Sequence, residues 1–297
     1  MKILIAKNAG FCFGVKRAIN IAVDCEDDGG NIFTLGPIIH NPQVVKKLEE
    51  SSNVIPKGSI DEMAEGTVIL RSHGVKLEEL DKAKDKGLSV VDATCPFVKK
   101  TQDYVRSLSE EGYTVVVVGE KEHPEVQGIV SYGKNEVIVA SNVDELKGLN
   151  RGKKIGIVAQ TTQSQKRLQE IVAYCVGIAS ELKVINTICN ATTVRQDESV
   201  DIARVSDCVI VVGGKNSANT GRLVELCRAI QPNTHHIEVA EEIEKGWLDP
   251  AGSVGVTAGA STPDWIILEV IEKLRELGPE EEANQGEDAD GRPAMKN

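Results

Sequence analysis

Short runs of β-branched and aliphatic residues alternate with amphipathic helical segments along most of the chain, and this alternation constrains the fold most strongly. The runs are apolar on both faces, which is typical of strands buried inside parallel sheets, and the helical segments supply the crossover connections. The sequence therefore predicts a parallel α/β fold. The expected strands are Lys2–Ala6, Asn31–Leu35, Thr67–Arg71, Ser89–Asp92, Thr114–Val118, Glu136–Ala140, Lys154–Ala159, Lys183–Thr187, Cys208–Val212, His236–Val239 and Ser253–Thr257.

Length and charge narrow the class of protein. A chain of 297 residues is about twice the usual domain length, so we expect two or three domains. The net charge of −11 removes the usual electrostatic basis for binding nucleic acid or anionic lipid. No apolar run approaches the roughly 18 residues of a membrane span, and the run Met1–Ala6 is too short for a secretory signal. We therefore expect a cytoplasmic protein, with a disordered acidic tail over residues 278–297.

Three of the seven cysteines recur in equivalent positions. Cys12, Cys95 and Cys189 each precede a predicted helix, and they are separated by 83 and 94 residues. An odd number of cysteines without a disulfide-scaffold spacing indicates reduced thiols, metal ligands or catalytic groups. Counting 28 residues forward from each cysteine reaches a polar residue in a loop after a predicted strand, and these residues are His40, His123 and Ser217.

A second set of polar residues repeats the pattern. His73, Thr161 and Ser261 lie 61, 66 and 72 residues after the three cysteines, and each follows a predicted strand. We infer three similar α/β units, over residues 13–94, 95–187 and 188–277, with residues 1–12 adding a strand to the third unit. Ligands bind open parallel sheets at the carboxyl ends of their strands, so the three units would converge on one central site.

The residue types at this site permit more than one chemistry. Three thiolates from three units could hold a cubane iron–sulfur cluster by three corners and leave one iron open, but the spacing alone also fits zinc or simple core cysteines. Imidazoles, hydroxyls, the amide of Asn219 and helix N-termini together form an anion site suited to phosphate or diphosphate. Glu125 lies beside His123 and could relay protons.

Several conspicuous residues are expected to play no part. Cys175, Cys208 and Cys227 lie in apolar stretches and are predicted to be core residues, and Cys25 ends a helix. His235 and His236 match no motif and are assigned a surface or capping role.

The ordered motifs resemble those of a known family, the hydroxymethylbutenyl diphosphate reductases (IspH, also called LytB) of the non-mevalonate isoprenoid pathway. The resemblance covers roughly residues 1–277. It is carried by Gly10–Val15 (GFCFGV), Gly36–Asn41 (GPIIHN), Arg71–Gly74 (RSHG), Asp92–Pro96 (DATCP), Gly119–Glu125 (GEKEHPE), Gln160–Thr162 (QTT), Cys189–Thr193 (CNATT), Gly214–Asn219 (GKNSAN) and Thr257–Ser261 (TAGAS).

The resemblance implies a trefoil of three α/β units with pseudo-threefold symmetry around a central [4Fe-4S] cluster. The cluster would be held by Cys12, Cys95 and Cys189, with one iron open to substrate. It also implies a catalytic group of His123, Glu125 and Thr161. The substrate-binding residues implied are His40, His73, His123, Thr161, Ser217, Ala218, Asn219 and Ser261. Ala218 stands where some members have a second serine, so only a backbone N–H contact is expected there.

The reaction implied is a two-electron reductive dehydroxylation of 4-hydroxy-3-methylbut-2-enyl diphosphate to isopentenyl and dimethylallyl diphosphate. Electrons would come from an external donor such as ferredoxin or flavodoxin, because the sequence carries no flavin or nicotinamide motif. The alternative from another class is a non-catalytic regulator that binds diphosphate or zinc. Metal content distinguishes the two.

Overall fold

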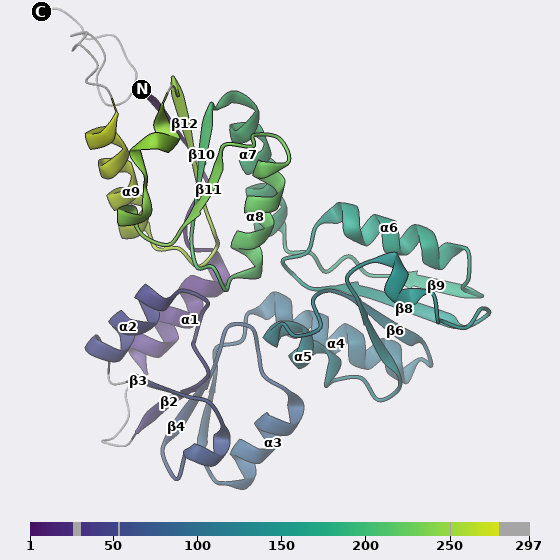
Figure 1. The fold of residues 1–297 in the computed structure, drawn as a ribbon. Coiled ribbons are helices and arrows are strands. Elements are labelled where there is room, and N and C mark those ends of the chain that lie inside the picture. The colour runs from purple at the N-terminus through teal and green to yellow at the C-terminus, as the bar shows by residue number, and fades with distance from the viewer. Residues whose placement is uncertain (26–30, 53, 250, 279–297) are drawn as a thin grey trace, which may run out of the picture.

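The computed structural model describes residues 1–25, 31–52, 54–249 and 251–278, and its strands form three separate parallel sheets of four strands (Figure 1). We call the parts built on these sheets the first, second and third lobes. The first contains β2 (Ile32–Leu35), β3 (Val54–Lys57), β4 (Thr67–Leu70) and β5 (Ser89–Asp92). The second contains β6 (Thr114–Val118), β7 (Val137–Ala140), β8 (Lys154–Ala159) and β9 (Glu181–Val184). The third contains β10 (Cys208–Val212), β11 (Thr234–Ile237), β12 (Ser253–Ala258) and β1 (Lys2–Ile5).

The three sheets share one strand order. The orders are β3-β2-β4-β5, β7-β6-β8-β9 and, read from the other edge, β11-β10-β12-β1. The N-terminal strand β1 thus occupies the place that β5 and β9 occupy in the other lobes, pairing in parallel with β12 through Lys2↔Ser253 to Ile5↔Val256. The predicted parallel α/β class and its threefold repetition are confirmed, and the unit boundaries at residues 13, 95 and 188 stay a prediction.

Within the described ranges, each lobe carries three α-helices, which cover both faces of its sheet (Figure 1). The helices are α1 (Phe13–Asp24), α2 (Pro42–Ser51) and α3 (Leu77–Asp85) in the first lobe, α4 (Pro96–Glu110), α5 (Pro124–Val130) and α6 (Gln165–Val176) in the second, and α7 (Asn190–Val205), α8 (Ala218–Arg228) and α9 (Asp264–Leu277) in the third. Short 3₁₀ turns lie at Ile60–Glu62, Val143–Leu146, Ala240–Glu242 and Lys245–Leu248. None of the helices described is long and apolar enough to cross a membrane.

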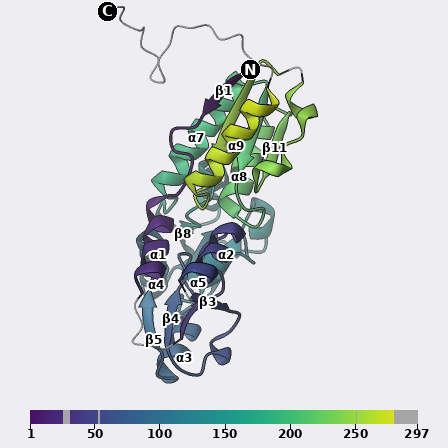
Figure 2. The ribbon, with the colours of Figure 1, turned by 90° about the vertical axis from the view of Figure 1, so that its left-hand side faces the viewer.

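The third lobe shows why its strands are apolar on both faces. Cys208, Ile210 and Val212 of β10 pack in one core cluster with the apolar side of α9, whereas Val209 and Val211 pack in another with residues of α7 and α8. Successive side chains of a strand point to opposite faces, so a strand between two helical layers must be apolar throughout. Figure 2 shows α9 lying over one face of this sheet.

The sequence analysis missed one strand and placed two others two residues late, and all three are edge strands. β3 was not predicted because it is short and contains Pro56, which lacks an amide donor and is tolerated only at a sheet edge. β9 begins at Glu181 and β11 at Thr234, two residues earlier than expected in each case. Polar residues obscured the start of β9, where Glu181 forms an ion pair with Lys154 at 2.6 Å. The predicted tail lies outside the described residues from 279 onward.

Candidate functional site

The loops that leave equivalent strands meet where the three lobes join. Cys12, Cys95 and Cys189 follow β1, β5 and β9 and immediately precede α1, α4 and α7. The loops after β2, β6 and β10 carry His40, His123 and Ser217, and those after β4, β8 and β12 carry His73, Thr161 and Ser261. The offsets seen in the sequence therefore correspond to matching strand ends.

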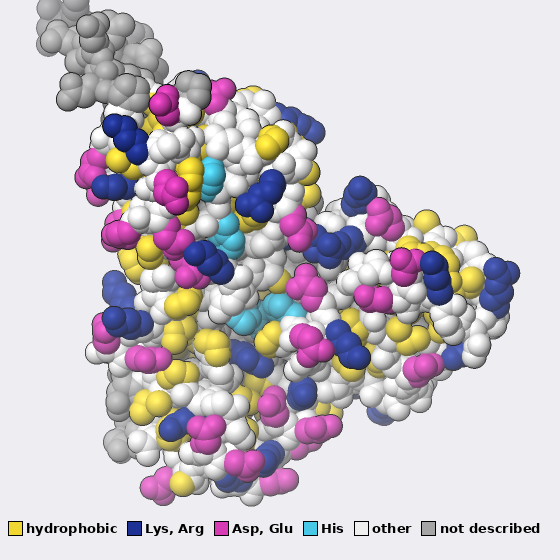
Figure 3. Space-filling model, in the orientation of Figure 1, with side chains coloured by type: hydrophobic (Ala, Val, Ile, Leu, Met, Phe, Trp, Pro, Cys, Tyr) yellow, Lys and Arg dark blue, Asp and Glu magenta, His cyan; other side chains and the backbone are white. Residues whose placement is uncertain are grey.

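Every predicted site residue lines one cavity at this junction. Figure 3 shows histidine side chains gathered at the surface where the lobes meet. The predicted residues that line the cavity are Cys12, His40, His73, Cys95, His123, Glu125, Thr161, Cys189, Ser217, Ala218, Asn219 and Ser261. The structure shows their position, and their individual roles stay proposals.

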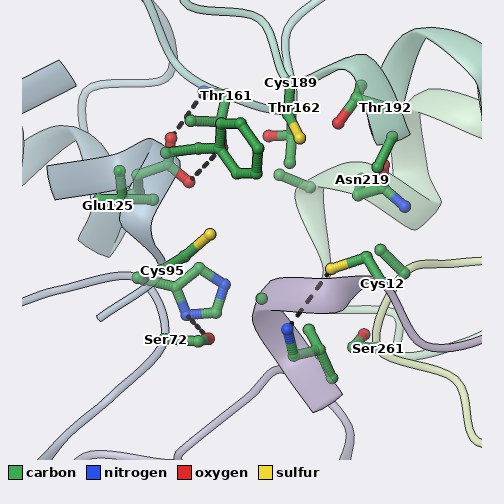
Figure 4. Close-up of a pocket in the computed structure, with 18 of the residues that line it drawn as sticks. Cys12, Ser72, Cys95, Glu125, Thr161, Thr162, Cys189, Thr192, Asn219 and Ser261 are labelled. Atoms are coloured by element: carbon green, nitrogen blue, oxygen red, sulfur yellow. Dashed lines mark hydrogen bonds between the residues drawn. The ribbon is translucent and has the colours of Figure 1, made fainter. Parts of the chain in front are cut away.

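The three cysteine sulfurs point into a common space (Figure 4). Each cysteine is the N-cap residue of its helix, and the Sγ of Cys12 accepts a hydrogen bond from the amide of Val15 at 3.5 Å. The amide-rich helix N-terminus favours negative charge on such a sulfur. The amide of each cysteine is also anchored, by Ala260 O at 3.0 Å, Ser72 O at 2.9 Å and Thr161 O at 2.9 Å respectively.

Gly14 leaves the space beside these sulfurs open. A Cβ at this position would lie 2.6 Å from Cys95 Sγ and 4.0 Å from Cys12 Sγ. Any larger residue would therefore displace the Cys95 side chain or fill the space that the sulfurs face.

Burial keeps two of the thiols protonated when no metal is bound. Burial raises the pKa of Cys95 to about 11, against the lowering effect of the Phe97 and Val98 amides, and it also raises the pKa of Cys189. Metal binding must release such protons, because the thiolate is the ligand. Arg195 lies beside this site, buried, and its Nη1 and Nη2 donate to Ala191 O at 2.9 Å and Gly10 O at 2.8 Å.

Three histidines contact one another in the same cavity. The ring centroids of His40 and His73 are 4.3 Å apart, and each lies 5.6 Å from the centroid of His123. Burial lowers the pKa of His123 to about 4, with a smaller contribution from repulsion by His40 and Arg71. Burial is also the main cause of the lowered pKa values of His40 and His73. Burial therefore favours neutral imidazoles, and an anion in the cavity would favour their hydrogen-bond-donating or cationic forms.

Several buried polar atoms in the cavity have no protein partner. Both ring nitrogens of His40 and both side-chain polar atoms of Asn219 are buried without a hydrogen bond. Unpaired buried polar groups are costly, so a ligand that pairs with them gains affinity. Asn219 belongs to the first turn of α8, which is capped by Ser217, so amide N–H groups lie near the same atoms.

Glu125 is fully buried and is held by Thr161. Its Oε1 accepts a hydrogen bond from the Thr161 amide at 2.6 Å, and its Oε2 lies 3.0 Å from the Thr161 hydroxyl (Figure 4). Burial raises the pKa of Glu125 to about 7, although both Thr161 contacts lower it. A carboxyl group with this pKa exchanges a proton readily near neutral pH.

Sequence reasoning missed five residues at or behind the cavity. Ser72, Thr162, Thr192 and Arg195 line it, and Arg71 is a half-buried cation that lowers the pKa values of the three histidines. The spacing of Thr192 and Arg195 on one helix face is visible in the sequence, but only the structure shows that this face is buried. Thr192, Arg195 and Ser199 are buried polar residues at helical spacing on one face of α7.

The residues expected to stand apart do so. Cys175, Cys208 and Cys227 are fully buried among apolar side chains. His235 stacks on Trp247 with ring centroids 3.9 Å apart, and His236 Nε2 lies 2.8 Å from Gly213 O.

Comparison with known proteins identifies the family. The family model described as "LytB protein" matches residues 3–275. The chain belongs to the LytB family. Two LytB relatives named 4-hydroxy-3-methylbut-2-enyl diphosphate reductase come from Geobacter metallireducens and Pelobacter propionicus. They are 56% and 55% identical to this chain over 277 residues, which is 93% of this chain and 98% and 99% of theirs.

Two solved LytB structures share the fold. One is titled as (E)-4-hydroxy-3-methyl-but-2-enyl diphosphate reductase, the terminal enzyme of the non-mevalonate pathway; it is 45% identical, with a TM-score of 0.68, over 93% of this chain and 100% of that one. The other is the E-1-hydroxy-2-methyl-but-2-enyl-4-diphosphate reductase from Plasmodium falciparum. It is 29% identical, with a TM-score of 0.88, over 92% of this chain and 88% of that one. The resemblance inferred from the motifs is confirmed.

Proposed function

We propose that this LytB chain is a 4-hydroxy-3-methylbut-2-enyl diphosphate reductase. The reaction breaks the allylic C–O bond, consumes two electrons and two protons, releases water and yields isopentenyl and dimethylallyl diphosphate. The observation that carries the proposal is the single cavity, which combines three thiols, a cluster of anion-binding groups and a carboxyl group with a pKa of about 7. The near-full-length relatives named for this activity support it.

We propose that Cys12, Cys95 and Cys189 hold a [4Fe-4S] cluster, with one iron free of protein ligands. The fit rests on thiols from three lobes that face one space, on helix N-termini behind them and on the room left by Gly14. Among the described residues, no three His, Cys, Asp or Glu side chains are grouped closely enough to hold a single metal ion. When bound, the cluster would supply electrons and a Lewis-acidic iron.

The diphosphate is assigned to the histidines and to the third-lobe loops. His40 and Asn219 offer unpaired buried polar atoms, and the first turn of α8 directs amide groups toward an anion. His73, His123, Ser217 and Ser261 line the same space, and Ala218 has a backbone amide to offer. Ser261 Oγ donates to His40 O at 3.0 Å, which joins the third lobe to the first around this site. Holding one end of the substrate fixes the other for reaction.

Glu125 and Thr161 are assigned to proton delivery. When Glu125 is protonated, its Oε2 is 3.0 Å from Thr161 Oγ1 and its proton can pass to that hydroxyl, while Oε1 remains fixed by the Thr161 amide. Thr161 also lines the cavity, so its own hydroxyl proton can turn toward the substrate oxygen. The pair thus delivers the proton needed to release water. His123 Nδ1 accepts from the Glu125 amide at 3.1 Å, which leaves its Nε2 to donate.

An external donor such as ferredoxin or flavodoxin is proposed to supply the electrons one at a time. The expected cytoplasmic location stays a prediction.

The proposed reaction is tested by anaerobic incubation of the iron-loaded protein with 4-hydroxy-3-methylbut-2-enyl diphosphate and reduced methyl viologen. We expect viologen oxidation coupled to formation of both five-carbon diphosphates, and loss of both in Cys95→Ser. Iron-loaded protein that binds the diphosphate without converting it would support the regulator alternative.

A further inference from the structure

A shallow groove on the molecular surface reaches the cysteine site from outside the substrate cavity. It is lined by Asn8, Phe13, Pro96, Val194 and Asn190, and four more residues, Phe97, Cys189, Ala191 and Arg195, line both the groove and the cavity. The four shared residues therefore place the groove next to the space that the sulfurs face. The groove is formed where α1, α4 and α7 begin, which are the three helices that follow the cysteines.

The floor of the groove is unusually apolar for an exposed surface. Phe13 is 65% exposed and Phe97 is 48% exposed, although the chain contains only four phenylalanines. Exposed aromatic side chains gathered in one depression are typical of protein interaction sites. Both residues come within two positions of a cysteine of the metal site, Phe13 after Cys12 and Phe97 after Cys95.

On α1 and α4, each phenylalanine of the groove has a lysine on the same helix face. Lys16 and Lys100 each follow one of the two phenylalanines by three residues, which places lysine and phenylalanine on the same helix face. Both lysines and Lys7 are exposed, and within the part of the chain that the structure describes none of the three forms an ion pair. The α7 side instead carries Asp197 and Glu198, of which Glu198 accepts two hydrogen bonds from Asn8.

We propose that this groove is the docking site of the electron donor, a small redox protein with acidic residues around its redox centre. The proposal rests on the proposed function. In a chain with a net charge of −11, the lysines of α1 and α4 give an acidic partner a local point of attraction, and the phenylalanines give it an apolar contact. At each docking the donor is oxidised by one electron and the metal site is reduced by one. Two dockings supply one turnover.

The test compares two electron sources for the same iron-loaded protein. Reduced ferredoxin must dock, whereas reduced methyl viologen reaches the site by diffusion. In the double variant Lys16→Glu/Lys100→Glu we expect the KM for ferredoxin to rise about tenfold or more, since charge reversal removes electrostatic steering. The viologen-driven rate should stay unchanged. Phe13→Ala should raise the same KM without abolishing the salt dependence of the ferredoxin rate.

Lys166→Glu is the matched control, because Lys166 is 86% exposed on α6 and away from the groove. It should leave both rates unchanged. An unchanged KM for ferredoxin in the double variant would overturn the proposal. An equal loss of the ferredoxin-driven and viologen-driven rates at full iron content would also overturn it, because the lysines would then act in the reaction itself and not in docking. Viologen-driven turnover without any ferredoxin-driven turnover would refute the acidic partner, whereas absence of both in the wild type would refute the proposed function itself.

Discussion

Glu125 and Thr161 are joined by two hydrogen-bonding contacts, although they lie 36 residues apart and come from different loops of the second lobe. Glu125 is in the first turn of α5, which follows β6, and Thr161 follows β8, the neighbouring strand of the same parallel sheet. The carboxyl ends of adjacent parallel strands lie side by side, so the fold brings a buried acid against a hydroxyl that faces the cavity. The proposed proton route follows from this placement.

Replacing the acid should separate binding from turnover. We expect Glu125→Gln to lower kcat by about 10²–10⁴-fold, the usual range for a positioned general acid, because an amide cannot supply the proton. Substrate affinity and iron content should change little, since glutamine keeps an oxygen for the Thr161 amide. Viologen-driven kinetics together with substrate binding measures both. Glu122→Gln, at an exposed position three residues away, is the control, and wild-type turnover in Glu125→Gln would refute the proton route.

The same carboxyl group should determine how the turnover number falls at alkaline pH. Burial raises its pKa from 4.5 to about 7, so the group is protonated below that pH and loses its proton above it. Turnover should therefore fall as pH rises through about 7. Viologen-driven kcat measured between pH 6 and pH 9 tests for this fall. The residual activity of Glu125→Gln should not show it. A rate that rises through neutrality would contradict the assignment of Glu125 as acid.

Gly14→Ala should impair metal loading more than folding. The added Cβ would lie 2.6 Å from Cys95 Sγ, so the cysteine side chain must move. We expect a severalfold lower iron content after anaerobic reconstitution and a loss of about 1–3 kcal/mol in unfolding free energy, the typical effect of overpacking. Gly148→Ala is the control, because nothing lies within 4 Å of the Cβ it would add. Full iron content in Gly14→Ala would show that the space beside the sulfurs is not used.

Arg195 should stabilise the cysteine loops more than Arg17 does. Arg195 donates to Ala191 O and Gly10 O at 2.9 and 2.8 Å, whereas the half-buried Arg17 reaches Thr94 O and Asp92 O at 3.3 and 3.4 Å. Charged hydrogen bonds contribute about 1.5–3 kcal/mol each. We expect Arg195→Gln to cost about 3 kcal/mol in anaerobic denaturant unfolding and to speed iron release to a chelator. Arg17→Gln should have a smaller effect on both, and equal effects would refute the distinction.

The sequence predicts most accurately the strands that helices bury on both faces. The central strands β6, β8, β10 and β12 are nearly continuous apolar runs because helices cover both sides, and each was located to within a residue of its observed end. Edge strands have one unpaired side and tolerate polar residues or proline, as at Glu181 and Pro56. Their limits depend on pairing partners that a single sequence does not display.

The candidate site was predicted to the extent that its residues lie at strand ends. Cysteines, histidines and hydroxyls recur there at matching offsets, and the structure brings them into one cavity. Arg195 escaped because it lies inside helix α7, where an arginine usually indicates a solvated face. Arg71 was not predicted because its effect on the site is electrostatic. It lowers the pKa values of three histidines from two lobes, and a single sequence does not show that they lie close to it.

The central claim is that the three thiols hold an iron–sulfur cluster with one iron open to substrate. The most direct measurement is iron and acid-labile sulfide per chain on anaerobically purified protein, with Mössbauer spectra before and after addition of 4-hydroxy-3-methylbut-2-enyl diphosphate. We predict a cubane cluster with one distinct iron site whose signal changes when the substrate is added. The account would be contradicted by bound zinc, by failure to reconstitute a cluster, or by a Mössbauer spectrum that does not change when the substrate is added.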